Sequence, residues 1–182
     1  AFNRRAAALA AELVREFAAG PPERGMYLRV NYDVLLATDD LISVELEEER
    51  DFGGGRPGTR FFGLTYDLRR AGRELRLDEL FKTDSDFERA LRLHAYGRIN
   101  RGYREINRRH GAGGPPPENE DLMTPDRVDV IEEWAMTPRG VVVYFNFPQV
   151  MAAFSRNFVP YDAIKDLLRA GGPAAVAARE VR

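Results

Sequence analysis

The sequence predicts an α+β domain in which an antiparallel sheet of about five strands packs against helices, in the order α-βββ-α-ββ-α. Segments with alternating apolar residues indicate the strands, and segments whose apolar residues recur every three or four positions indicate the helices. The chain has 182 residues, a usual size for one domain. We therefore expect a single domain over residues 1–172, followed by a peripheral C-terminal tail over residues 173–182.

The first helix is expected over residues 2–19. Leu9, Leu13 and Phe17 recur at intervals of four and therefore share one face of a helix. The sequence Gly-Pro-Pro at 20–22 ends this pattern, because proline cannot donate the next helical hydrogen bond. We expect the helix to lie on the sheet with one side exposed to water.

A β-hairpin is expected over residues 26–50. The apolar residues of its first strand are Met26, Leu28, Val30, Tyr32, Val34 and Leu36. In its second strand, Ile42, Val44 and Leu46 alternate with Ser43, Glu45 and Glu47. Because successive side chains point to opposite faces of a strand, we expect one face of the hairpin to be apolar and the other to be wet and acidic. A glycine-rich loop over 53–58 and a third strand over 61–68 follow.

A long helix is expected over residues 85–110, where Ser85 and Glu88 have the spacing of a capping box. The residues predicted for its apolar face are Leu91, Ala95, Ile99, Tyr103 and Ile106. The residues predicted for its opposite face are Arg98, Arg101, Arg104 and Arg108. The next segment, 111–127, is rich in glycine, proline and acidic residues and predicts a surface loop.

The remainder of the chain predicts a second hairpin, over 130–137 and 141–147, and a last helix. Three consecutive valines at 141–143 indicate a strand that is buried on both faces. Pro160 is expected to open the last helix and Gly171 to end it.

The residue types of common catalytic and metal sites are sparse. Cysteine is absent, the two histidines, His94 and His110, lack the spacing of a metal motif, and no Gly-x-Ser-x-Gly sequence is present. We therefore expect no catalytic activity, no metal and no cofactor. The formal net charge of −2 predicts no general attraction to nucleic acid, and no apolar run reaches the about 18 residues of a membrane span.

Three sets of residues form the candidate binding surface: an acidic stripe of Glu45, Glu47 and Glu49, a glycine loop of Gly53, Gly54, Gly55 and Arg56, and an arginine stripe of Arg98, Arg101 and Arg104. The acidic stripe could attract a basic partner or supply a carboxylate pair for glycan hydrolysis. The glycine loop resembles a phosphate cradle only in its glycine content. The arginine stripe could hold an anionic polymer or an acidic protein. The alternative for each set is an ordinary solvated surface.

Three segments, at 41–68, 71–81 and 134–168, resemble a bacterial extracytoplasmic family. The family pattern is a Ser-Val strand, a Gly-Gly-Ala-His-Pro loop, a Phe-Asp-Leu strand and a Leu-x-Asp-Leu-Phe segment, with a closing hairpin and a helix led by Pro-Tyr. This is the RsiV-type domain of unknown function, which occurs in the anti-sigma factor RsiV, in some peptidoglycan deacetylases and in a secreted mycobacterial immunogenic protein. Arg56 replaces the histidine of the loop, Gly55 replaces its alanine, and the further strand that precedes the first helix of the family is absent.

The resemblance implies a non-catalytic binding or sensor domain of a bacterial envelope or secreted protein, with a partner such as lysozyme or a cell-wall component. Two alternatives remain open, a glycan-acting enzyme of the cell envelope and a structural module beside a catalytic domain. Because the first residue is alanine, we expect the chain to be a fragment or a processed form. The sequence leaves the oligomeric state open.

Overall fold

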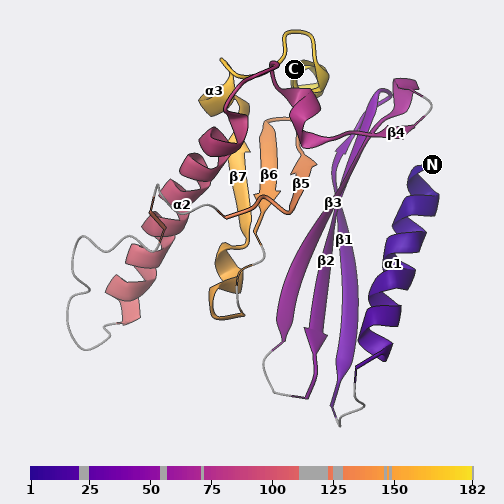
Figure 1. The fold of residues 1–182 in the computed structure, drawn as a ribbon, viewed down its shortest axis with the longest axis vertical. Coiled ribbons are helices and arrows are strands. Elements are labelled where there is room, and N and C mark those ends of the chain that lie inside the picture. The colour runs from indigo at the N-terminus through magenta and orange to yellow at the C-terminus, as the bar shows by residue number, and fades with distance from the viewer. Residues whose placement is uncertain are drawn as a thin grey trace.

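The computed structural model describes residues 1–20, 25–53, 57–70, 72–110, 123–124, 129–145, 147 and 149–181. The fold class is α+β, as predicted, and the strands form two antiparallel sheets (Figure 1). The larger sheet has the order β1 (Tyr27–Ala37), β2 (Leu41–Asp51), β3 (Gly58–Asp67) and β4 (Arg73–Glu74). The smaller sheet has the order β5 (Glu133–Met136), β6 (Gly140–Tyr144) and β7 (Arg156–Pro160). The two predicted hairpins do not join into the single sheet that was expected, because β5 and β6 pair with each other and with β7 and not with β1–β4. Strands β4 and β7 add to the five predicted strands, which gives sheets of four and three strands.

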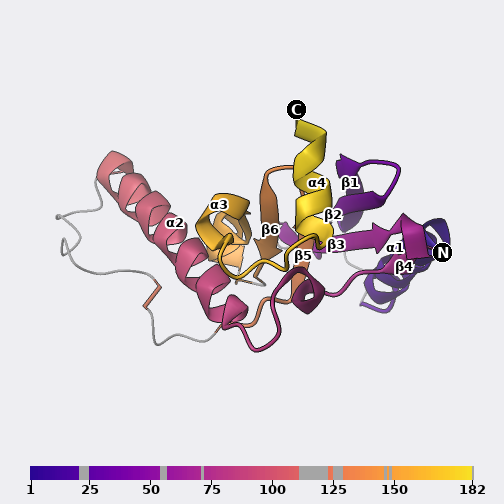
Figure 2. The same ribbon diagram turned by 90° about the horizontal axis from the view of Figure 1, so that it is seen from above.

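The helices are α1 (Phe2–Ala18), α2 (Phe87–His110), α3 (Tyr161–Ile164) and α4 (Pro173–Ala177), with 3-10 turns η1 (Leu68–Arg70), η2 (Leu77–Leu80), η3 (Gln149–Phe154) and η4 (Ala178–Val181). Helices α1 and α2 lie on the outer sides of the two sheets, and the short C-terminal helix α4 lies near one end of the strands. Figures 1 and 2 show the layers in the sequence α1, larger sheet, smaller sheet and α2. The interface between the two sheets is therefore the centre of the molecule.

Helix α1 covers one face of the larger sheet. Leu9 and Leu13 are the buried residues of the helix, as their spacing predicts, and they pack in one cluster with Val44, Leu46 and Leu64 of the strands. Both the helix and the strands contribute apolar side chains to this cluster, so the burial of these side chains holds α1 on the sheet.

Strand β6, in the middle of the smaller sheet, is buried on both faces, as the valine run predicts. Val141 and Val143 belong to the main core with Leu91 and Ile99 of α2. Val142 lies on the other face, with Ala135, Tyr144 and residues of the larger sheet. Each of the three valines is at most 1% exposed. A strand in this position has no wet face, which explains why its sequence does not alternate.

The acidic face of β2 is only partly wet, whereas the prediction was a wet face along the whole strand. Ser43 is 0% and Glu45 is 5% exposed, because the smaller sheet lies over this half of the strand. The Ser43 hydroxyl pairs with the Thr65 hydroxyl at 2.7 Å and accepts a hydrogen bond from the backbone N–H of Met136, in the smaller sheet, at 2.8 Å. The buried hydroxyls are therefore satisfied by the neighbouring strand and by the second sheet.

The apolar face predicted for β1 is also only partly correct. Leu36 is buried, but Tyr32 is 72% and Val34 is 53% exposed. The pairing of β1 with β2 shifts its register between Val34 and Leu36, as expected of a β-bulge. In addition, β1 is the edge of the larger sheet, where fewer neighbours cover each side chain.

Two helix predictions need correction. Helix α2 begins at Phe87, and the Ser85 hydroxyl donates to the Lys82 carbonyl at 2.8 Å instead of taking part in the expected capping box. The face of α2 predicted to be apolar is buried at Leu91, Ala95 and Ile99, whereas Ile106 is 43% exposed. The core covers only the first half of α2, whereas the apolar spacing continues into the second half, which is not buried.

The C-terminal segment is part of the core. Residues 173–177 form α4, in which Ala174 and Ala177 are 2% and 0% exposed and pack in the main core cluster. The prediction of a peripheral tail is therefore wrong for these residues. Small side chains were overlooked as core residues because alanine is also common on helix surfaces.

Parts of two predicted loops, 54–56 and most of 111–127, lie outside the described residues. Met123, which is described, is 1% exposed. Its backbone N–H and C=O are both hydrogen-bonded to the side-chain amide of Asn100 at 2.8 Å. Asn100 thereby fixes this point of the chain against α2.

The two sheets approach most closely where β3 meets β5. A Cβ added to Gly63 would lie 1.7 Å from the carbonyl oxygen of Trp134 and 2.4 Å from its carbonyl carbon. The Gly63 N–H donates to a carboxylate oxygen of Glu133 at 3.2 Å. Only glycine fits here, because the obstacle is backbone and cannot rotate away.

We expect Gly63→Ala to lower the free energy of unfolding by about 3 kcal/mol or more, because the added methyl group must push β3 and β5 apart. Urea unfolding followed by circular dichroism measures this change. The matched control is Gly97→Ala, since a Cβ at Gly97 in α2 would meet nothing within 4 Å. The control should stabilise the protein by roughly 0.5–1 kcal/mol. Equal effects at both positions would contradict the tight crossing of the sheets.

Candidate binding surface

The acidic stripe lies on one face of β2, as predicted, but its members differ in burial. Glu45 is buried beneath the smaller sheet, whereas Glu47 and Glu49 are half-buried farther along the strand. In the register of the sheet, Asp33 and Asn31 of β1 lie opposite Glu45 and Glu47. The stripe therefore runs from the interior of the molecule to its surface.

Glu45 is fixed by two donors from the smaller sheet. The Tyr144 hydroxyl and the Arg156 Nε both donate to its Oε2, the latter at 2.7 Å. Burial, and then the hydrogen bond to Glu45, raise the pKa of Tyr144 far above its ordinary value. The protonated phenol, which donates to Glu45, is therefore favoured. This cluster links the two sheets by charge-assisted hydrogen bonds.

Glu49 is held in a different way, by its neighbour on β1. The Tyr27 hydroxyl donates to Glu49, and the Arg29 guanidinium lies 3.6 Å from the same carboxylate and 6.0 Å from the Tyr27 ring centroid. The hydrogen bond to Glu49 raises the pKa of Tyr27. We define the acidic patch as Asp33, Glu47 and Glu49, the acidic residues of this face that reach solvent.

A buried carboxylate on the opposite face of β2 was missed. Glu48 is 0% exposed, and its Oε2 accepts from Arg60 at 2.5 Å and lies 3.8 Å from Arg50. Glu16 of α1 completes the network, 2.9 Å from Arg60. The signal was present in the sequence, because Glu48 occupies a position on the face that also carries Val44. An acidic residue on the apolar side of a strand, with arginine two positions away, indicates a buried ion pair.

The glycine loop is described only at Gly53, whereas Gly54, Gly55 and Arg56 lie outside the described residues. Gly53 has φ +89, and its N–H donates to the Asp51 carboxylate at 2.8 Å. Glycine is favoured at this position because side chains rarely adopt the left-handed conformation.

The arginine stripe lies on α2, on the far side of the smaller sheet from the acidic stripe (Figure 1). Arg98 donates to the Phe158 carbonyl of β7 at 3.2 Å and lines a hollow of about 740 Å³ together with Arg101 and His94. Partial burial, followed by the charges of Arg98 and Arg101, lowers the pKa of His94. Arg104 is half-buried on the next turn. The two stripes therefore do not form one site.

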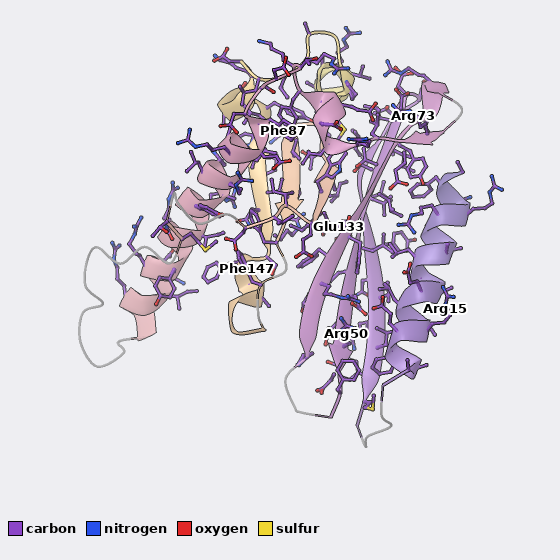
Figure 3. All side chains as sticks on the ribbon, viewed as in Figure 1. Arg15, Arg50, Arg73, Phe87, Glu133 and Phe147 are labelled. Atoms are coloured by element: carbon purple, nitrogen blue, oxygen red, sulfur yellow. The ribbon has the colours of Figure 1, made fainter. Side chains whose placement is uncertain are left out.

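Another hollow, of about 710 Å³, opens beside β5 and is lined by Glu133, Glu74 and Leu75 among others. Figure 3 shows Glu133 between the two sheets. Burial raises the pKa of Glu133, although the hydrogen bond from Gly63 opposes this shift. The carboxyl group is thus held in a position where its charged form is disfavoured.

Within the part of the chain that the structure describes, no group of three or more histidine, cysteine, aspartate or glutamate side chains could hold a metal ion. None of the described helices is long and apolar enough to cross a membrane.

Comparison with solved structures shows the same fold. A member of the DUF3298 family from Bacteroides fragilis has a TM-score of 0.51 and 19% identity, over 88% of this chain and 61% of that one. A DUF3298 family protein from Pseudomonas aeruginosa has a TM-score of 0.51 and 18% identity, over 87% and 69% of the two chains. The chain thus spans less than two thirds of the Bacteroides protein. DUF3298 is a domain of unknown function, so these likenesses show the fold alone.

No family model and no curated protein matches the chain.

We expect Tyr144→Phe to lower the free energy of unfolding by about 1–3 kcal/mol, because Glu45 loses one of two donors in a buried site. Glu45→Gln should lower the free energy of unfolding by a similar amount. Loss of the ion pair with Arg156 contributes little to this change, because the Arg156 side chain is 43% exposed and water screens its charge. Urea unfolding of both single variants and the double variant measures the coupling. Fully additive losses would contradict a shared hydrogen-bonded cluster.

We expect Glu133→Gln to stabilise the protein at neutral pH. The pKa of Glu133 is raised in the folded state, so the folded protein resists losing this proton and becomes less stable as the pH rises through the titration of the carboxyl group. Glutamine removes that cost and can still accept from Gly63. Urea unfolding at neutral and at acidic pH should show a gain that disappears at acidic pH. A gain of equal size at both pH values would show that the charge is not its cause.

Proposed function

We propose that this chain is a non-catalytic, extracytoplasmic binding domain that recognises a basic protein through the acidic patch of Asp33, Glu47 and Glu49. The acidic patch lies on the face of the larger sheet that the smaller sheet covers only in part. Its partner would dock beside the smaller sheet, on the two strands that carry these carboxylates.

The observation that carries this proposal is the fixed position of Glu49. Its carboxylate is held by Tyr27 and Arg29 on a neighbouring strand, so that little side-chain entropy is lost when a partner binds. Charge on a rigid strand is suited to steering and orienting a partner of opposite charge. The arginine stripe is less suited to recognition, because Arg98 already donates to Phe158.

The engagement of Glu45 supports a binding role over the glycan-acting alternative. A carboxylate of an inverting pair must face a water molecule or the substrate. Glu45 instead faces the interior and accepts hydrogen bonds from Tyr144 and Arg156. The position of Glu45 between the sheets supports a structural role for this residue, which is to link the two sheets.

The cellular setting and the kind of partner come from the resemblance to the RsiV-type domain. Lysozyme, a basic protein, is recognised by RsiV through protein–protein contact. The likeness in fold to the DUF3298 structures is compatible with the resemblance, because the resemblance also implies an α+β architecture.

We expect lysozyme to bind the chain in isothermal titration calorimetry, with an affinity that falls as the salt concentration rises. Glu47→Lys/Glu49→Lys should weaken binding by about tenfold or more, because two attractive charges become repulsive. The matched control Glu12→Lys/Glu88→Lys reverses two exposed charges on other elements and should leave the affinity unchanged.

Cytochrome c serves as a basic protein without relation to the cell wall. Equal binding of lysozyme and cytochrome c would reduce the interaction to net charge and contradict specific recognition. No binding of lysozyme or of peptidoglycan fragments would contradict the proposed function. Release of soluble sugars from peptidoglycan by the chain would contradict the proposal that the domain is non-catalytic.

A further inference from the structure

We propose that two copies of this chain associate through their β1 strands, which pair antiparallel about Asn31 and join the two larger sheets into one. The partner is thus a second copy of the chain, and the surface is the outer edge of β1. This edge shares Asp33 with the acidic patch, whereas Glu47 and Glu49 of the patch lie on the adjacent strand β2.

Among the described residues, β2 is the only strand that pairs with β1, so the outer edge of β1 has no strand partner there. Its strand pairs with β2 on one side, and it is the end strand of the larger sheet (Figure 2). It is 11 residues long and contains no proline. Residues 27–34 keep one register with β2, before the shift at Val34. Long, regular edge strands are uncommon in proteins that remain monomeric, because their unpaired backbone groups favour pairing with another chain.

The side chains at this edge also favour a covered position. Tyr32 and Val34 are 72% and 53% exposed, on the same face of β1 as the half-buried Leu28 and Val30. Four apolar side chains at alternate positions form a continuous row that α1 covers only in part. Neighbouring strands from a second copy would cover the exposed half of this row.

The register is set by charge. In an antiparallel pair centred on Asn31, Arg29 of each copy lies opposite Asp33 of the other, which gives two opposite-charge pairs around the twofold axis. On the other face, Val30 lies opposite Tyr32 of the second copy and Leu28 lies opposite Val34. From Leu28 to Val34, apolar residues therefore lie opposite apolar residues, Asn31 lies opposite Asn31, and each charged residue lies opposite a residue of the other sign.

Neighbouring registers lose this complementarity. With the axis at Val30, Arg29 would lie opposite Asn31, and Asp33 opposite Tyr27. With the axis at Tyr32, Arg29 would lie opposite Leu35, and Asp33 opposite Asn31. Only the centre at Asn31 opposes the two charges, and directly opposed charges of unlike sign stabilise a strand pair.

The rest of the fold leaves room for a second copy. Helix α1 packs on the larger sheet through Leu9 and Leu13, against a cluster centred on β2 and β3. The smaller sheet packs on the opposite face, where Leu35 of β1 is its contact. Both layers therefore lie above and below the plane of the sheet, whereas the proposed partner lies within that plane.

Analytical ultracentrifugation over a range of protein concentrations tests the proposal. The chain is expected to dimerise reversibly. Arg29→Asp and Asp33→Arg should each weaken association by about tenfold to a hundredfold, because each places like charges opposite one another in two places. Circular dichroism verifies that each variant is folded, and Arg101→Asp on α2 is the matched control that should dimerise like the parent chain.

Two rescue experiments separate this register from a general effect of charge. The double variant Arg29→Asp/Asp33→Arg exchanges the charges and should restore dimerisation. An equimolar mixture of the two single variants should form a mixed dimer, because one copy then presents two acidic residues and the other two basic ones. Restoration in both experiments would support the register centred on Asn31.

A chain that remains monomeric at every concentration would overturn the proposal, as would a dimer that none of these substitutions affects. Failure of both rescue experiments would overturn the register. Lysozyme binding is measured separately by calorimetry, so a monomeric chain that still binds lysozyme would contradict only the dimer, and a dimer that does not bind would contradict only the proposed function.

Discussion

The close approach of the two sheets is the constraint on which the rest of the structure depends. At Gly63 the backbone of β3 lies against the backbone of β5, with no space for a Cβ atom. The Ser43 hydroxyl, on the adjacent strand, accepts from the backbone N–H of Met136, so the same crossing also satisfies buried polar groups. This contact buries half of the acidic face of β2, and it leaves the outer faces of the two sheets to α1 and α2.

Strand β2 consequently carries a buried carboxylate on each of its two faces. Glu45 is satisfied by Tyr144 and Arg156 from the smaller sheet, and Glu48 is paired with Arg60 beneath α1. Buried ion pairs gain little net stability, because desolvation offsets most of their attraction. Their greater effect is on specificity, since a shift of β2 by one residue would move each carboxylate to the opposite face of the sheet, away from its partners.

Sequence patterns predicted the parts of the fold that depend on a single element. The spacing of Leu9 and Leu13 predicted the buried face of α1, and the valine run predicted the doubly buried β6. Alternation in β2 correctly placed Glu45, Glu47 and Glu49 on one face. It could not predict that the smaller sheet covers this face at Glu45, because that contact joins residues far apart in the chain.

The same limit applies to the candidate surface and to the C-terminus. Alternation placed Tyr32 on an apolar face but could not show that β1 is an edge strand, which is a property of the whole sheet. The arginine stripe was correctly assigned to one helix, yet nothing in its spacing indicated that Arg98 would bind a carbonyl of β7. The alanine residues of α4 did not indicate that the helix is buried, because the burial of alanine depends on what packs against it.

The chain has one tryptophan, and the fold places it at the crossing of the sheets. The carbonyl of Trp134 is the group that meets Gly63, and its partly buried indole packs against the main core. The indole shares a face of β5 and β6 with Val143, which packs against α2, so tryptophan fluorescence originates from the main core on that side of the smaller sheet. The emission therefore reports locally, without any introduced label, whether this core opens before, or together with, the loss of helical signal.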